Sequence, residues 1–250
     1  MTYPKRHFSS QDYTTAHADA FARRYDDGIH DVKVQVVRRF LGNVQGKRIL
    51  DLGCGVGNFA ALCADLGAQV VASDFAKSMI TATSQRYGVI FPIIRSSAEA
   101  PPFQRDHFDV ALALDVIEHL YHPDQMLRRT HELLRPNGRL LITTDRQARF
   151  HVGFLPKYVK DATRNGLTTL GLRKPPPRSP YETPLCTHVH EYSMRELISL
   201  AENAGFQLID FDTYSLRPRY SLYGRTVEAL MRDGLRQYKW DYAIYLFGKH

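Results

Sequence analysis

A glycine-rich turn between two apolar runs constrains the fold of this chain more than any other feature. The first run contains Asp51 and ends at Gly53, and glycine then recurs at every second position. A helix-forming stretch, 59–66, follows, and the next apolar run, 69–73, ends in Asp74. This order of strand, turn, helix, strand and acid predicts a pocket for a ligand with a ribose. Glycines admit a ligand close to the backbone, and Asp74 can accept hydrogen bonds from ribose hydroxyls.

The spacing of the glycines excludes two common nucleotide motifs. Gly53, Gly55 and Gly57 form G-x-G-x-G, whereas the dinucleotide fingerprint is G-x-G-x-x-G and would need glycine where Asn58 stands. No segment fits the phosphate-binding pattern G-x-x-x-x-G-K-[ST]. A plain tight connection is the alternative for the glycines alone, and the two flanking aspartates favour a ligand site.

Four segments together resemble class I S-adenosylmethionine (SAM) methyltransferases, in particular the ubiquinone-biosynthesis-like O-methyltransferases of small molecules. The segments are D-L-G-C-G-V-G-N at 51–58, S-A-E-A-P-P-F at 97–103, F-D-V-A-L-A-L-D-V-I-E-H-L at 108–120 and L-R-P-N-G-R-L-L-I at 134–142. The resemblance covers about 46–145 and resumes near 188–212. It implies an α/β fold with a doubly wound, mostly parallel seven-stranded sheet and a cap insertion after strand 5. It also implies SAM as cofactor and S-adenosyl-L-homocysteine as product.

The resemblance assigns a set of cofactor-binding residues: Asp51, Gly53, Cys54, Gly55, Gly57, Asn58, Asp74, Phe75, Met79, Ser97, Ala98, Glu99 and Asp115. Relatives often carry an acid where this chain has Ser97, so the contact to the adenine amino group is weaker here. Phe75 and Met79 either pack against adenine or belong to the core. Cys54 sits where a small residue suffices, and we do not interpret it as a nucleophile.

The first candidate catalytic residues follow the fourth predicted strand. Asp115, Glu118 and His119 are spaced i, i+3, i+4, which would place them on one helical face. Neutral His119 can accept a proton from a hydroxyl; the three groups could instead bind a divalent metal, which we do not favour, or support the cofactor structurally. His188 and His190 precede a capping box of Ser193 and Glu196 and either face the substrate or only begin a helix.

The pattern of the 250 residues predicts one large domain with an insertion. Its parts are an N-terminal arm with helices (1–45), a cofactor-binding core (46–145), a basic and aromatic cap (146–187) and the remainder of the core sheet (188–250). A helix is predicted at 32–41, with Val32, Val36, Val37, Phe40 and Leu41 on one face. Strands are predicted at 47–52, 69–74, 90–95, 108–114, 139–144, 206–212 and 241–248, the last two as an edge hairpin. Gly138 and Gly205 are predicted to end helices before strands.

The net charge of +7 resides in one segment. Residues 146–178 hold eight Lys or Arg and one Asp, so the remaining residues carry 25 basic and 25 acidic groups. The segment also contains aromatic residues and predicts contact with an anionic or amphipathic acceptor, or with a membrane surface. Three cysteines that make no paired framework and an N-terminus without an apolar stretch predict a cytoplasmic protein, and the basic segment predicts peripheral contact with a membrane.

Three classes of function remain open from the sequence. The leading one is a small-molecule O-methyltransferase of quinone, polyketide or lipid-linked metabolism. The second is a metal-dependent RNA 2′-O-methyltransferase, because small-RNA enzymes of that kind hold a metal with a similar Glu-x-x-Glu-His run and a distant histidine. No recognisable RNA-binding module accompanies the domain, which makes nucleic acid the weaker partner. The third is a protein that binds SAM without catalysis.

Overall fold

The computed structural model describes residues 13–26, 31–88, 90–145, 189–214 and 242–249. The predicted cap, 146–187, lies outside the described residues. The helices are α1 (Thr15–Asp26), α2 (Asp31–Leu41), α3 (Asn58–Asp65), α4 (Lys77–Tyr87), the 3₁₀ helix η1 (Ile117–His119), α5 (Pro123–Leu133) and α7 (Met194–Asn203). The strands are β1 (Arg48–Leu52), β2 (Gln69–Asp74), β3 (Ile93–Arg95), β4 (Phe108–Leu114), β5 (Leu134–Asp145), β6 (Phe206–Tyr214) and β7 (Tyr242–Lys249).

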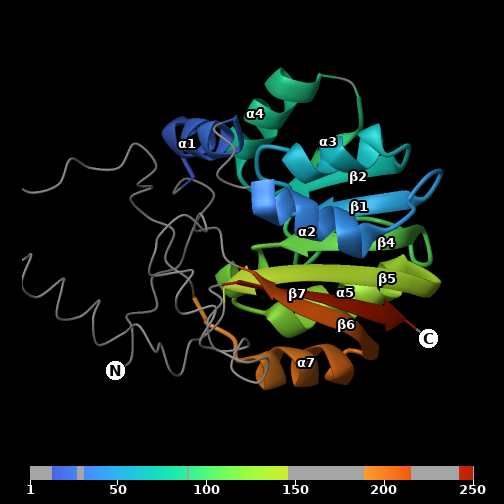
Figure 1. Ribbon diagram of the computed structural model, residues 1–250. Coiled ribbons are helices and arrows are strands. Elements are labelled where there is room, and N and C mark those ends of the chain that lie inside the picture. The colour runs from blue at the N-terminus through green and yellow to red at the C-terminus, as the bar shows by residue number, and fades with distance from the viewer. Residues whose placement is uncertain (1–12, 27–30, 89, 146–188, 215–241, 250) are drawn as a thin grey trace, which may run out of the picture.

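The strands form one sheet in the order β3-β2-β1-β4-β5-β7-β6 (Figure 1). The first five are parallel, and β7 runs antiparallel between β5 and β6. The prediction of a doubly wound, mostly parallel seven-stranded sheet is therefore confirmed. The last two strands pair as predicted, with β6 at the edge.

Two strands begin three or more residues away from their predicted starts. β3 begins at Ile93 rather than at 90, and β5 begins at Leu134, so Gly138 lies within a strand and does not end a helix. Asn137, with a φ of 64°, turns the chain there instead. Asparagine adopts this left-handed conformation more readily than most residues because its short side chain bonds locally.

Alternating side chains of the sheet divide the core between two faces. Leu50 packs with residues of α5 and α7, whereas its neighbour Ile49 packs with residues of α2 and α3. Figure 1 shows α2 and α3 on one face of the sheet. Full burial of such a side chain contributes about 1.5–3 kcal/mol, so the two cores hold β1 and β4 rigidly under the loops at their carboxyl ends.

The apolar face predicted for α2 needs a correction. Val37, Phe40 and Leu41 are buried as predicted, but Val32 is 41% exposed. Lys33 takes the buried position instead, with 2% of its surface exposed. The helix therefore carries a charged group on its inner face.

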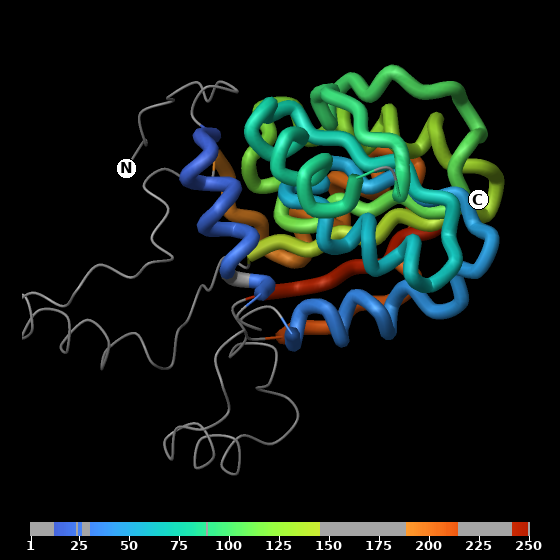
Figure 2. The backbone as a smooth tube through the Cα atoms, turned by 90° about the horizontal axis from the view of Figure 1, so that it is seen from above, coloured from blue at the N-terminus to red at the C-terminus, as the bar shows by residue number. Residues whose placement is uncertain are grey.

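Helix α1 packs against α4 near the carboxyl ends of the central strands (Figure 2). Ala18 joins Val56, Ala76 and Met79 in a small apolar cluster. Arg86 of α4 pairs with Asp26 at the end of α1. Helix α1 lies within the N-terminal part, 1–45, for which helices were predicted. Within the described ranges no helix has the length and apolar character needed to span a membrane.

Candidate active site

The glycine turn connects β1 to the start of α3. Gly53, Gly55 and Gly57 have φ angles of 67°, 56° and 82°, a region that glycine enters without steric cost. A Cβ atom at Gly57 would lie 2.5 Å from Cγ2 of Thr83, and one at Gly53 would lie 2.5 Å from Cγ2 of Val116. Both positions leave no room for a side chain. Gly53 and Gly55 also line a cavity at the carboxyl end of the strands.

Asp74 connects the end of β2 to this turn. Its Oδ2 atom accepts a hydrogen bond from the Gly55 backbone N–H at 3.0 Å, and its Oδ1 atom accepts one from the Ala76 N–H at 2.8 Å. Burial raises the pKa of Asp74 to about 6, against the effect of these hydrogen bonds. Thr83 donates to the Gly55 carbonyl at 2.8 Å. The turn and the acid thus form one rigid unit.

Three residues of the cavity wall each carry a buried polar side-chain atom without a hydrogen-bond partner among the described residues. The atoms are Oδ2 of Asp51, Nδ2 of Asn58 and Oγ of Ser96. Burial, and then the charge of Asp74, raise the pKa of Asp51 to about 7. Buried polar atoms normally have partners, so these acceptor and donor groups fit a polar, cationic ligand such as the amino-acid end of SAM.

The cavity has a volume of about 360 Å³, within the range of small-molecule sites. It includes twelve of the thirteen predicted cofactor residues, since Gly57 lies outside it. Aromatic side chains complete its wall: Tyr13, Phe21, Tyr25, Phe59, Phe75, Tyr121 and Tyr242.

The predicted adenine region lines the same cavity. Phe75 is 38% exposed and meets the ring of Tyr13 edge-on at 5.2 Å, whereas Met79 is buried in the cluster with Ala18. Met79 therefore belongs to the core as well as to the wall. Glu99 accepts hydrogen bonds from the backbone N–H groups of Tyr121 and His122 at 3.0 and 2.8 Å. It holds the loop after η1 against the cavity.

The predicted helical face of Asp115, Glu118 and His119 was wrong. Asp115 has a φ of 56°, and only a 3₁₀ turn, η1, follows it. Glu118 is 1% exposed and accepts from Thr144 Oγ1 at 3.1 Å. Burial, and then Asp115, raise the pKa of Glu118 well above its usual range. Glu118 is a buried support for η1 and lines the cavity together with Asp115 and the half-buried His119.

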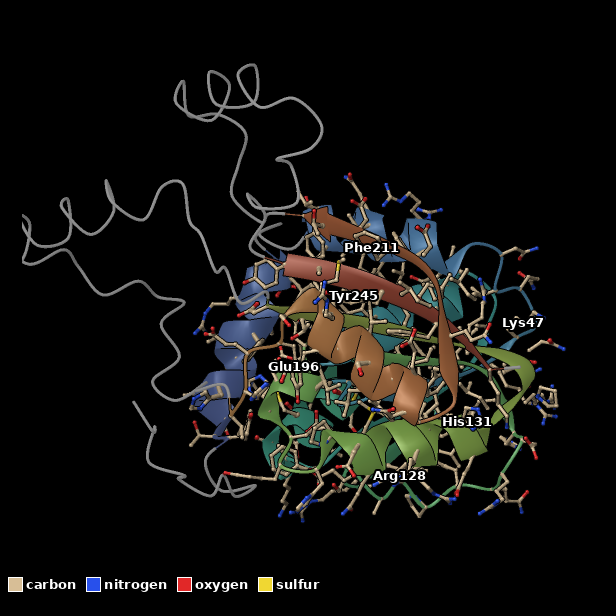
Figure 3. The ribbon with its side chains drawn as sticks, turned by 90° about the horizontal axis from the view of Figure 1, so that it is seen from below. Lys47, Arg128, His131, Glu196, Phe211 and Tyr245 are labelled. Carbon is tan, nitrogen blue, oxygen red and sulfur yellow. The ribbon has the colours of Figure 1, made fainter. Side chains whose placement is uncertain are left out.

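Of the two distant histidines, the structure describes His190, whose backbone N–H donates to the Glu118 carbonyl at 3.2 Å. His190 pairs with Glu196 at 2.8 Å on the surface beside α7, whose position Figure 3 shows, and it is not part of the cavity wall. His188 lies outside the described residues. Ser193 caps α7 by accepting from the Glu196 N–H at 3.3 Å, which is the Ser193 half of the predicted capping box, while the Glu196 carboxylate pairs with His190. The assignment of His190 as catalytic receives no geometric support.

Sequence reasoning missed Lys33. Its Nζ atom donates to Asp115 Oδ2 at 2.5 Å and lies 5.3 Å from the centre of the Phe59 ring. The sequence did indicate a buried lysine, because Lys33 is four residues before Val37 and so falls on the apolar face of α2. Cys54 lines the cavity as predicted; burial raises the pKa of its thiol, which fits no nucleophilic role.

The sheet order, the glycine turn and the acid that ends β2 define a class I SAM-dependent methyltransferase. A family model described as a methyltransferase domain matches residues 22–210, and the chain belongs to this family. A ubiquinone biosynthesis O-methyltransferase of Ruegeria pomeroyi is 36% identical over 102 residues, which are 40% of this chain and 41% of the relative. The chain thus spans about two fifths of the length of that relative.

Two further relatives cover more of the chain. A probable S-adenosylmethionine-dependent methyltransferase of Mycolicibacterium smegmatis is 25% identical over 211 residues, 82% of this chain and 72% of the relative. The crystal structure of an S-adenosylmethionine-dependent methyltransferase from Mesorhizobium loti has a TM-score of 0.60 and 17% identity, and the match covers 86% of this chain and 96% of that one. The second likeness shows the fold.

Proposed function

We propose that this enzyme methylates a hydroxyl oxygen of a small molecule. The observation that carries the proposal is a single cavity that contains both the cofactor-binding turn and His119. Its aromatic wall suits a flat or prenylated acceptor better than a charged polymer. The ubiquinone biosynthesis O-methyltransferase among the relatives supports the same acceptor chemistry.

His119 is the proposed general base. Bound SAM would supply a methyl group already activated by its sulfonium, which the acceptor oxygen takes as S-adenosylhomocysteine forms. What remains for the protein is to align the oxygen, exclude water and remove the hydroxyl proton. Neutral imidazole accepts such a proton near neutral pH, and His119 is the histidine in the described cavity wall.

We further propose that the acceptor is anionic or amphipathic, so that the enzyme works at the surface of a membrane. The support is the charge of residues 146–178, which hold the whole net charge of the chain together with Phe150, Phe154 and Tyr158. Reversal of Arg149, Lys157, Lys160 and Arg164 to Glu should weaken binding to anionic vesicles, most strongly at low salt. Unchanged vesicle binding would refute this part.

Methyl-labelled SAM and a set of acceptors test the proposed function. The set contains catechols with and without a prenyl tail, a hydroxybenzoate, a primary amine and a short RNA. Label should enter the catechols, and mass spectrometry should place the methyl group on oxygen. Label that enters only the RNA or the amine would contradict the proposal.

A further inference from the structure

A lysine on the inner face of a helix needs an explanation of its own. Lys33 lies on α2 with 2% of its surface exposed, among the largest fully buried side chains of the described structure. A buried ammonium loses its hydration and persists only beside a negative partner. The family assignment and the proposed chemistry give it no task.

The ammonium group of Lys33 contacts Asp115, the acid that follows β4 in the sequence. Its Nζ atom donates to Oδ2 of Asp115 at 2.5 Å, while Oδ1 of Asp115 accepts from Thr143 Oγ1 at 2.7 Å. The backbone N–H of Asp115 donates to the Thr143 carbonyl at 2.9 Å. Asp115 is thus fixed between α2 and β5, at a left-handed position of the backbone.

Acidic side chains outnumber basic side chains around the cavity. Six Asp or Glu line it, whereas Lys33 is the one Lys or Arg among the described lining residues. The acids are Asp51, Asp74, Glu99, Asp115, Glu118 and Asp145. The positive charge of Lys33 also lowers the pKa of Asp51 and of Glu118 against the effect of burial. The single ammonium of Lys33 therefore favours the ionised form of several carboxyl groups.

The Lys33 ammonium already occupies one carboxylate oxygen of Asp115, so a divalent cation would have to compete with it for that ligand. Both oxygens of Asp115 have partners in Lys33 and Thr143, and Glu118 is buried against Thr144. Within the described part of the chain no three His, Cys, Asp or Glu side chains are arranged to hold a metal ion. A cation brought to Asp115 would meet the repulsion of Lys33 in a site of low dielectric.

We propose that Lys33 is a built-in cation of the active site: a positioning residue whose ammonium holds and neutralises Asp115, so that transfer proceeds without a divalent metal. The part about transfer rests on the proposed function. The part about the cation site does not, since it concerns the protein and its cofactor pocket alone. Lys33 acts through Asp115 and needs no contact with the acceptor.

A small cation should replace the ammonium when the side chain is removed. We would prepare Lys33→Ala and, as a matched control, Lys47→Ala, which removes an exposed lysine at the opposite end of the sheet from α1 (Figure 3). n-Propylammonium at millimolar concentrations should raise the melting temperature of Lys33→Ala by about 2–4 °C. The wild type and Lys47→Ala should not respond. Lack of a selective shift would overturn the assignment of a cation site.

Chelation tests the second half of the proposal on the wild type, so it does not depend on whether Lys33→Ala folds. Methyl transfer should be equally fast in EDTA and in excess Mg²⁺ or Mn²⁺. Lys33→Ala should lose about 10²-fold or more in transfer rate, and n-propylammonium should restore part of it. Transfer that stops in EDTA and returns with Mg²⁺ would overturn the proposal. If the wild type methylates none of the acceptors, the proposed function fails, and the melting experiment still decides on Lys33.

Discussion

The carboxylate of Asp74 accepts a hydrogen bond from the backbone N–H of Gly55, which ties the end of the second strand to the centre of the glycine turn. The partner of its other oxygen is the Ala76 N–H at the start of α4. A single side chain therefore sets the distance between the two loops that form the cofactor pocket. It can also accept from a ribose while it does so, because each carboxylate oxygen has two lone pairs.

Asp74→Asn should weaken the binding of SAM and of S-adenosylhomocysteine. The amide would place an N–H group against the Gly55 or the Ala76 N–H, and the loss of a charge-assisted hydrogen bond costs about 1–3 kcal/mol. Calorimetric titration should show this loss, whereas Asp65→Asn, an exposed acid at the end of α3, should bind normally. Unchanged affinity in Asp74→Asn would contradict the cofactor-binding role assigned to Asp74 at the end of β2.

Two glycines of the turn should respond differently to alanine. Both have positive φ angles, so each substitution introduces backbone strain of about 1–2 kcal/mol. A methyl group at Gly57 also meets Thr83 at 2.5 Å and the Tyr87 ring at 3.1 Å, while a methyl group at Gly55 meets nothing within 4 Å. Urea unfolding should therefore show that Gly57→Ala is the less stable protein by about 1–3 kcal/mol. Equal losses would contradict the described packing.

His119→Ala should slow methyl transfer by about 10²–10⁴-fold, the usual effect of removing a general base. Its affinity for SAM should change little. His190→Ala is the matched control, because that ring pairs with Glu196 outside the cavity wall. Full activity of His119→Ala, or a loss of the same size in His190→Ala, would contradict the assignment of His119 as the general base.

The binding of SAM should depend on pH through Asp51. Its pKa in the folded protein is about 7, above its ordinary value of 3.8, so the protein without ligand loses stability as pH rises from about 4 to 7. A cationic ligand favours the ionised carboxylate, and its affinity should rise over the upper part of this window, up to about tenfold per pH unit. Calorimetry from pH 5.5 to 8 measures this.

Asp51→Asn provides the control for the pH dependence. This variant should bind SAM weakly at every pH and should be more stable than the wild type at pH 8 in the absence of ligand. Asp210→Asn, which removes an exposed acid on β6, should keep the wild-type profile. A steep profile that persists in Asp51→Asn would assign the titration to another group.

Local signals made most of the fold and half of the site predictable. The glycine spacing and the flanking aspartates specify a turn with positive φ angles, which glycine adopts without steric cost, and the alternation of strands and helices specifies a parallel sheet. The helical face of Asp115 and His119 was wrong because a left-handed residue at the end of β4 interrupts the period, and spacing alone does not reveal such a residue. Lys33 was missed because its partner, Asp115, is 82 residues away in the sequence.

The most direct test of the account follows the methyl group itself. The purified protein is given methyl-labelled SAM, EDTA, a prenylated catechol and a competing RNA in one reaction, and the organic and aqueous phases are counted separately. The account predicts label in the organic phase, on the oxygen of the catechol, at the rate seen with Mg²⁺. Label in the RNA, or none at all until a divalent metal is added, would contradict it.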